Sequence, residues 1–142
     1  MINTALVSFG MSGKVFHAPF IATNPNFNLV GSWERSTKNI EAAYPGTKSY
    51  NSYEELLADP TIDLVVVNSP NDSHFAYTKS ALLAGKHVVC EKAFTNTSAE
   101  AQELDDLANT IRKTRNLQIG NAVIVIANLQ RLTGAAGQKE NS

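Results

Sequence analysis

A turn rich in small residues near the N-terminus has the residue types needed to hold a phosphate group. It reads SFGMSG over residues 8–13 and directly follows a short apolar run. Dinucleotide-binding turns need one glycine for the turn, a second for close approach of the pyrophosphate, and a third for helix–strand packing. The second and third are present, while Ser8 takes the first position. We expect the backbone amides at the start of the following helix to bind the pyrophosphate; the residues concerned are Gly10, Met11, Ser12 and Gly13.

Two other interpretations of this turn need to be weighed. One is an ordinary glycine-rich turn with no ligand, which stays open on the turn alone. The other is a Walker-type phosphate loop, suggested by the pair Gly13 and Lys14. That loop is excluded because the spacing is wrong and Val15 supplies no hydroxyl for a metal ion. No metal site is predicted.

A second group of polar residues follows the next apolar segment. Glu34 lies 24 positions after Gly10, close to the spacing of roughly 20 residues at which a carboxylate meets the adenine ribose hydroxyls of NAD. Beside it, Arg35, Ser36 and Lys38 could instead bind the 2′-phosphate of NADP, the arginine through a bidentate contact or by stacking on adenine. Because a carboxylate repels that phosphate and the arginine attracts it, the sequence leaves NAD against NADP open.

Short apolar strands alternating with helices must position these residues. The continuous β-branched run at 64–67 and the run at 87–90 are typical of strands buried on both faces, and residues 5–7 and 27–33 predict two more. Helices are expected over 13–22, 37–44, 72–84 and 98–111, with capping boxes at 52–55 and 97–100 and a C-cap at Gly85. This alternation predicts an α/β Rossmann-type doubly wound fold with a mainly parallel sheet.

Composition excludes several classes of protein. The chain has 142 residues, 43% of them hydrophobic, and a net charge of −1, which suits one globular domain and gives no electrostatic case for binding nucleic acid or membrane. No stretch approaches the roughly 18 apolar residues of a membrane span. The single cysteine, Cys90, and the lack of a signal-peptide pattern predict a cytoplasmic location.

The last quarter of the chain differs from the rest. Residues 1–108 carry 7 Lys and Arg against 12 Asp and Glu, residues 109–142 carry 5 against 1, and every aromatic residue lies at or before Phe94. We therefore predict a domain over 1–108 and an atypical, partly disordered tail over 109–142, produced by a frameshift or truncation. Within that tail, the apolar run at 122–127 is consistent with one more strand or with an exposed aggregation-prone segment.

Three motifs in order resemble the Gfo/Idh/MocA family of oxidoreductases, which includes glucose–fructose oxidoreductase and inositol dehydrogenases. They read FGMSGKVFHAPF at 9–20, NSPNDSH at 68–74 and AGKHVVCEK at 84–92. The similarity covers residues 4 to about 108. It implies a nicotinamide-dependent enzyme, with NADP or NAD as cofactor, that moves hydride to or from a sugar- or polyol-like substrate.

The resemblance also implies roles for particular residues. Lys92, in the family's Glu-Lys-Pro motif, would bind the substrate hydroxyl, where a cation favours the developing alkoxide; Glu91 beside it would border the cofactor. A loop over the nicotinamide ribose would contain Ser69, Pro70, Asn71 and His74. Without the family, Lys92 would be interpreted as a surface lysine, and His17 and His74 as polar residues of a loop or helix edge.

Three departures from the family pattern bear on function. Ser8 replaces the first glycine, so its side chain is expected to crowd the turn, and Ala93 replaces the proline after Lys92. We expect the family's C-terminal α/β substrate domain, which supplies the catalytic histidine, to be missing from this chain, because residues 109–142 resemble neither the expected sixth strand nor that domain. We therefore expect cofactor binding without turnover unless a second domain is supplied. The alternatives are a non-catalytic dinucleotide-binding module and a non-functional gene product, and the oligomeric state is left open.

Overall fold

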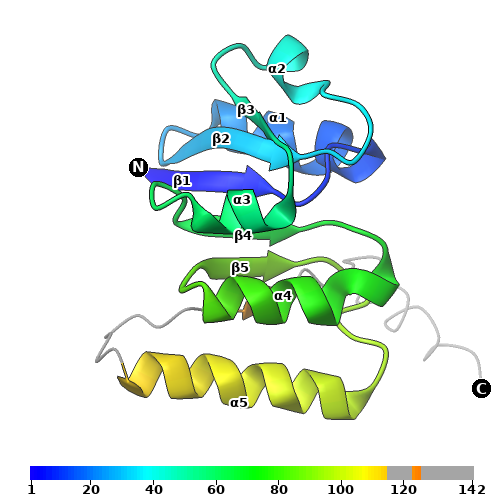
Figure 1. Cartoon of the computed structure of the whole chain (residues 1–142), viewed down its shortest axis with the longest axis vertical. Helices are drawn as coiled ribbons and strands as arrows, with labels where there is room; N and C mark the ends of the chain where they lie inside the picture. The colour runs from blue at the N-terminus through cyan, green and yellow to red at the C-terminus, as the bar shows by residue number, and fades with distance from the viewer. Residues whose placement is uncertain (115–122, 126–142) are drawn as a thin grey trace, which may run out of the picture.

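The computed structural model describes residues 1–114 and 123–125, and within them a single parallel sheet has the strand order β3-β2-β1-β4-β5-β6 (Figure 1). All five neighbouring pairs run parallel. This is the strand order of the doubly wound dinucleotide-binding fold, so the predicted fold class is confirmed. The strands are β1 (Ile2–Leu6), β2 (Phe27–Trp33), β3 (Lys48–Tyr50), β4 (Leu64–Val67), β5 (His87–Cys90) and β6 (Val123–Val125).

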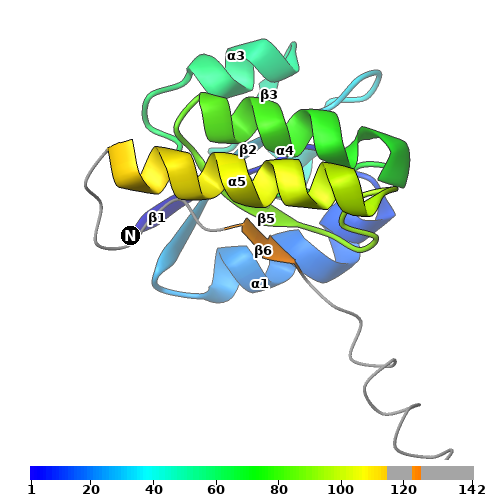
Figure 2. The ribbon, with the colours of Figure 1, turned by 90° about the horizontal axis from the view of Figure 1, so that it is seen from below.

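Helices cover both faces of the sheet. Figure 2 shows α3, α4 and α5 on one face and α1 on the other. A π-helical turn, Gly13–His17, runs directly into α1, and a 3₁₀ turn, Asn71–Ser73, precedes α4. The helices are α1 (Ala18–Thr23), α2 (Ile40–Ala43), α3 (Tyr53–Ala58), α4 (His74–Leu83) and α5 (Ser98–Thr114).

The central strands divide their side chains between two cores. In β4, Val65 and Val67 belong to the core under α3, α4 and α5, whereas Val66 belongs to the core on the α1 side. Residues of β1 alternate in the same way, Ala5 to the first core and Leu6 to the second. Because successive side chains point to opposite faces, only an all-apolar strand can be buried on both. The apolar runs therefore become the middle of the sheet.

Local signals in the sequence set the helix boundaries. Ser52 Oγ accepts the Glu55 amide at 3.0 Å at the start of α3, and Thr97 Oγ1 accepts the Glu100 amide at 3.2 Å before α5. The Glu100 carboxylate accepts the Thr97 amide in return, at 3.3 Å, which completes a capping box. Gly85, with φ of +79°, ends α4 in the left-handed conformation predicted for it.

The structure corrects the expectation that residues 109–142 do not resemble the sixth strand, and at residues 123–125 it decides between the two interpretations of the apolar run. β6 pairs with β5 in register Val89 to Ile124, so at residues 123–125 the apolar run is one more strand. The predicted boundary at residue 108 lies inside α5, which continues to Thr114, because helical spacing continues where charge and aromatic content change. The strand β3 was missed, since three residues are too few to show a period. The tail residues 115–122 and 126–142 lie outside the described part, so their predicted origin and disorder stay predictions.

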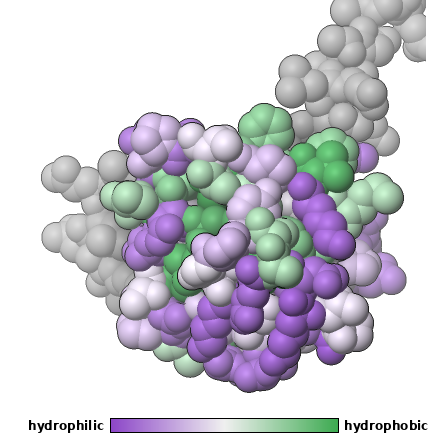
Figure 3. Space-filling model, turned by 90° about the horizontal axis from the view of Figure 1, so that it is seen from above, coloured by the Kyte–Doolittle hydropathy of each residue, from purple (hydrophilic) through white to green (hydrophobic). Residues whose placement is uncertain are grey.

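Exposed apolar side chains gather on the helical segment after β1. Helical backbone runs continuously over residues 11–23, and four of the larger exposed hydrophobic residues of the described part lie on it: Met11, Val15, Phe16 and Phe20. Figure 3, which views the molecule from the β3 end of the sheet, shows hydrophilic side chains over the lower part of that face and hydrophobic ones at its upper right. Within residues 1–114, none of the helices combines the length and the apolar character that a membrane span requires.

Candidate functional site

The carboxyl ends of β1 and β4 lie side by side at the point where the strand order reverses. From β1 the chain continues to β2 and β3 on one side, and β4 leads to β5 and β6 on the other. Loops leaving two neighbouring strands in opposite directions leave a crevice between them, and ligands of open α/β sheets bind there. The turn at 8–13 leaves β1 at this crevice and the segment 68–74 leaves β4.

A two-way hydrogen bond joins these two loops. Asn68 Oδ1 accepts the Ser8 amide at 3.0 Å, and Asn68 Nδ2 donates to the Ser8 carbonyl at 2.7 Å. Asn68 Nδ2 also lies 3.3 Å from Ser12 Oγ, whose hydroxyl donates to the Asn68 carbonyl at 3.4 Å. The amide side chain of Asn68 therefore satisfies backbone groups that the end of β1 leaves unpaired. Ser8 Oγ accepts the Gly10 amide at 3.2 Å, so the hydroxyl expected to crowd the turn is accommodated within it.

Gly13 allows the helix after the turn to start close to β1. A Cβ at this position would lie 2.5 Å from the Ser8 carbonyl oxygen and 3.1 Å from Asn68 Nδ2. This is the packing role of the third glycine in a dinucleotide-binding turn. The first helical hydrogen bond runs from the Lys14 amide to the Gly10 carbonyl at 2.9 Å. The amides of residues 11–13 therefore precede the helical ladder and are available to an anion.

A cleft of about 350 Å³ opens beside this turn. It extends from the ends of β1 and β4 to the loop after β2, so it borders the turn, the candidate ribose-binding residues and part of the segment 68–74. Its lining residues are Val7, Ser8, Phe9, Gly10, Lys14, Trp33, Glu34, Arg35, Ser36, Thr37, Asn39, Ser69, Pro70 and Tyr77. Its size is in the range of small-molecule sites.

Glu34 uses both carboxylate oxygens on the backbone of the segment that follows it. Oε2 accepts the Asn39 amide at 2.9 Å and Oε1 accepts the Ile40 amide at 2.9 Å. Oε1 also accepts the Ser32 hydroxyl at 3.4 Å. The carboxylate thus caps the start of α2 and closes the loop of residues 35–38 into a ring.

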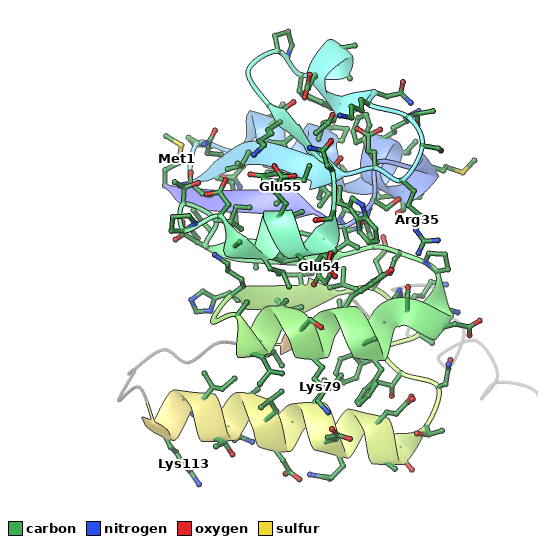
Figure 4. All side chains as sticks on the ribbon, viewed as in Figure 1. Met1, Arg35, Glu54, Glu55, Lys79 and Lys113 are labelled. Atoms are coloured by element: carbon green, nitrogen blue, oxygen red, sulfur yellow. The ribbon has the colours of Figure 1, made fainter. Side chains whose placement is uncertain are left out.

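Arg35 rests on an aromatic platform at the mouth of the cleft. Its Nη2 donates to the Tyr77 hydroxyl at 3.0 Å, and its guanidinium carbon lies 5.5 Å from the centre of the Trp33 ring. Figure 4 shows Arg35 reaching from the end of β2 toward α4. Trp33 stacks on Tyr53 at 5.7 Å and meets Tyr77 edge-on at 5.6 Å. These contacts hold the arginine in one place while it stays exposed.

His74 is fully buried, and each of its ring nitrogens faces a backbone carbonyl. Nδ1 lies 2.6 Å from the Ala93 oxygen and Nε2 lies 2.7 Å from the Ser69 oxygen. The imidazole therefore ties the segment after β4 to the loop after β5. With no exposed surface, His74 has no direct access to a ligand in this conformation, which argues against the cofactor contact expected for it. Asn71, in contrast, is exposed.

A side-chain contact also holds the loop after β5 to the helical segment after β1. His17 Nε2 and Glu91 Oε1 are in direct hydrogen-bond contact, which joins the helical segment after β1 to the residue after β5. Lys92 follows immediately and is exposed. Glu91 therefore acts on the neighbouring helix, and Lys92 is free to meet a ligand. Among residues 1–114 and 123–125, no three His, Cys, Asp or Glu side chains lie close enough together to hold a metal ion.

The cleft brings together six of the residues predicted from the sequence and adds others. Gly10, Glu34, Arg35, Ser36, Ser69 and Pro70 line it, while Met11, Ser12, Gly13, Asn71, His74, Glu91 and Lys92 lie outside its lining. Asn68, Trp33, Thr37 and Tyr77 were missed. Two features of the sequence could have indicated two of them. Asn68 directly follows the predicted strand at 64–67, as Ser8 directly follows the predicted strand at 5–7. Tyr77 lies three residues after His74, which places both on the same side of a helix. Lys38 is turned away, since its Nζ donates to Asn51 Oδ1 at 2.8 Å.

Comparison with known proteins agrees with this geometry. The family model described as "Oxidoreductase family, NAD-binding Rossmann fold" (Gfo/Idh/MocA) matches residues 2–120. The chain belongs to the Gfo/Idh/MocA oxidoreductase family. As a member of this family it contains the NAD-binding Rossmann domain. The glycine turn, the hydrogen bonds between Asn68 and Ser8, and the cleft lie at the carboxyl edge of its sheet.

Individual relatives show how much of a family member this chain covers. An uncharacterized oxidoreductase of Schizosaccharomyces pombe is 46% identical over 123 residues, covering 83% of this chain and 32% of the relative. The NADP(+)-dependent scyllo-inositol 2-dehydrogenase of Bacillus subtilis is 32% identical over 108 residues, covering 76% and 30%. A crystal structure of a Bacteroides fragilis protein, 43% identical, superposes with a TM-score of 0.78 over 92% of this chain and 36% of that one. The chain spans about a third of the length of these relatives.

Proposed function

We propose that the cleft at the carboxyl edge binds NAD or NADP, as the cofactor-binding part of an oxidoreductase that transfers hydride to or from a sugar- or polyol-like substrate. The observation that carries the proposal is the cleft itself, placed at the reversal of strand order and bordered by the Gly10–Gly13 turn. The dehydrogenation of scyllo-inositol by the B. subtilis relative supports the substrate class. The lone, buried Cys90 supports a cytoplasmic location.

The residues present fit a dinucleotide. The free amides of residues 11–13 and the exposed Gly10 would hold the pyrophosphate, and Trp33, Arg35 and Tyr77 offer flat surfaces and donors for the adenosine end. The bound nicotinamide would supply the hydride chemistry. Ser69, Pro70 and Asn71 would border the nicotinamide ribose, and the exposed Lys92 would hold the substrate hydroxyl, stabilising negative charge there by its own positive charge.

His74 and Glu91 are proposed to act on these groups through other residues. His74 would fix the distance between the Ser69 loop and the Lys92 loop, because it faces carbonyls of both. Glu91, paired with His17, would hold the base of the Lys92 loop against the helical segment after β1.

Titration with NADPH and NADH, followed by nicotinamide fluorescence, tests the proposal. We expect at least one of them to bind and to be displaced by the oxidised form. Failure of both to bind would refute it. A far-ultraviolet circular dichroism spectrum of the same sample shows whether the protein tested is folded.

A binding module without turnover is the second candidate for this chain taken alone. The contacts of two histidines near the crevice favour it, since His17 pairs with Glu91 and His74 is buried. Within the described residues, neither histidine is therefore available to act as an acid or base on a substrate. Screening inositols and sugars for cofactor reduction separates the two candidates: reduction by this chain would exclude the binding module.

A further inference from the structure

We infer that the cleft selects NADP(H) over NAD(H), with Glu34 acting as the closing group of a 2′-phosphate-binding loop and not as a ligand of the ribose hydroxyls. This inference rests on the proposed function, since it names which dinucleotide the same cleft prefers. It depends on three observations: the contacts of Glu34, the exposed side chains of the loop that it closes, and the platform under Arg35.

The first observation is that the Glu34 carboxylate is already engaged. An acidic residue that selects NAD needs oxygens directed at the 2′- and 3′-hydroxyls of the ribose. Here Oε1 and Oε2 each accept a backbone amide at 2.9 Å, from Ile40 and Asn39, and Oε1 has the Ser32 hydroxyl as a further donor. These donors orient the carboxylate toward α2 and offset its negative charge. The usual repulsion between this position and a phosphate is therefore reduced.

The second observation is the set of donors that the closed loop presents. Arg35, Ser36 and Thr37 line the cleft and are exposed, and Lys14 lines it from the helical segment after β1. The lining thus contains two cations, a capped carboxylate and, within the part of the chain that the structure describes, the hydroxyls of Ser36 and Thr37 without a hydrogen-bond partner. A 2′-phosphate needs donors of these kinds, and an arginine can bind it in a bidentate manner.

The third observation is that aromatic residues of the cleft hold Arg35 in position. One of its terminal nitrogens donates to Tyr77, and its guanidinium carbon lies 5.5 Å from the centre of the Trp33 ring. Tyr77 is itself fixed, because the Tyr53 hydroxyl donates to its carbonyl at 2.6 Å and the two rings are 4.8 Å apart. A preorganised guanidinium loses less entropy on binding than a free one, and its other N–H groups remain for the phosphate. Tyr77 is therefore a positioning residue for cofactor specificity, supplied by α4.

The alternative is that Glu34 leaves the α2 amides and binds the ribose diol of NAD. The two possibilities predict opposite effects for the same substitution. Glu34→Gln would weaken NADH selectively if the carboxylate were a diol ligand. If the carboxylate closes the loop, the amide side chain can accept only at its oxygen, the ring of residues 35–38 loosens, and NADPH is weakened more than NADH.

The experiment is a titration of the wild-type chain and four variants with NADPH and NADH by nicotinamide fluorescence. We expect the wild type to bind NADPH at least about tenfold more tightly than NADH. Arg35→Ala should remove most of that ratio by weakening NADPH much more than NADH, as expected for one lost charge-assisted contact. Tyr77→Phe and Glu34→Gln should reduce the ratio by smaller factors. Lys79→Ala is the control, since it removes a cation whose partner is Glu103, on α5, and both affinities should stay unchanged.

Competition with 2′,5′-ADP and 5′-AMP provides a second measurement that does not involve the nicotinamide. We expect 2′,5′-ADP to displace bound NADPH much more effectively than 5′-AMP, and the difference to disappear in Arg35→Ala. Equal or tighter binding of NADH by the wild type, or a selective loss of NADH in Glu34→Gln, would overturn the inference and leave the proposed function standing. Binding of neither dinucleotide by the folded wild type would refute both.

Discussion

Gly13 has no room for a side chain, and both the packing of the fold and the proposed cofactor site depend on this close approach. Replacing it with alanine would bring a methyl group to 2.5 Å from the Ser8 carbonyl oxygen, which belongs to backbone that Asn68 holds in place. We expect Gly13→Ala to lower the free energy of unfolding by about 1–3 kcal/mol, the usual cost of overpacking. Urea denaturation followed by circular dichroism measures this.

Gly10 in the same turn is the matched control. A Cβ there would have its nearest contact at 3.4 Å, with the Ser8 hydroxyl, which is the movable end of a side chain. Gly10→Ala should therefore change stability by much less than Gly13→Ala. Equal losses in the two variants would contradict the close approach of helix and strand at Gly13.

Cys90 is a residue whose chemistry is set by burial. Its side chain is inaccessible at the end of β5, and burial raises the pKa of the thiol to about 11. At about pH 8 the thiolate is thus a very small fraction, and only the thiolate reacts. We expect a colorimetric disulfide reagent to label the native chain slowly and the urea-unfolded chain rapidly. Rapid labelling of the native chain would show that β5 is open to solvent.

The raised pKa of Cys90 also predicts how the free energy of unfolding changes with pH. The thiol loses its proton near pH 8.5 when unfolded but only near 11 when folded. Because the unfolded state releases its proton first, this group's contribution is fully present below about pH 8.5 and is lost as the pH rises toward 11. A Cys90→Ala variant, which lacks the thiol, should show a smaller loss of stability over that range.

Among the elements, α3 shows how a single side chain sets the start of a helix that packs against the site. Ser52 accepts the Glu55 amide, and the helix that follows carries Tyr53, part of the platform beneath Arg35. We expect Ser52→Ala to lower the free energy of unfolding by about 1 kcal/mol, as for other lost N-caps. Thermal unfolding followed by circular dichroism measures the change.

Ser80→Ala is the corresponding control for that cap. Ser80 is exposed on α4, and its hydroxyl makes no hydrogen bond within the described residues. Alanine has the higher helix propensity, so this variant should be as stable as the wild type or slightly more stable. If Ser80→Ala lowered the free energy of unfolding as much as Ser52→Ala, the loss in Ser52→Ala could not be assigned to the N-cap.

For the molecule as a whole, the cleft exists only when three parts of the chain come together. Its walls come from the turn after β1, the loop after β2 and the segment after β4, so the unfolded chain cannot bind the dinucleotide with comparable affinity. At a concentration of 100 times the dissociation constant, NADPH should add about 2.7 kcal/mol to the free energy of unfolding. Urea denaturation with and without NADPH measures this. An unchanged free energy of unfolding at a concentration shown by fluorescence to saturate the site would contradict the assignment of the binding site to the cleft.

The sequence by itself determined the fold class and the position of the glycine turn. The apolar runs of β4 and β5 predicted their strands with the bounds that the structure has, because an all-apolar strand is a local signal of burial on both faces. The capping boxes and Gly85 predicted helix ends for a similar reason, since each depends on residues within one turn. The three-residue strand β3 carries no such signal, and the apolar run at 122–127 left β6 open between a strand and an exposed segment. The helix α5 continues past the change in charge that suggested a boundary.

Only the tertiary structure decided what the polar residues at the carboxyl edge do. Asn68 meets Ser8 across 60 positions, Tyr77 meets Arg35 across 42, and His17 meets Glu91 across 74. Such contacts depend on strand order and on the length of each crossover, and no local pattern encodes them. Glu34 is the clearest case: its spacing from Gly10 fits a ribose ligand, but its carboxylate caps the start of α2, because the fold brings the Asn39 and Ile40 amides within 2.9 Å of it.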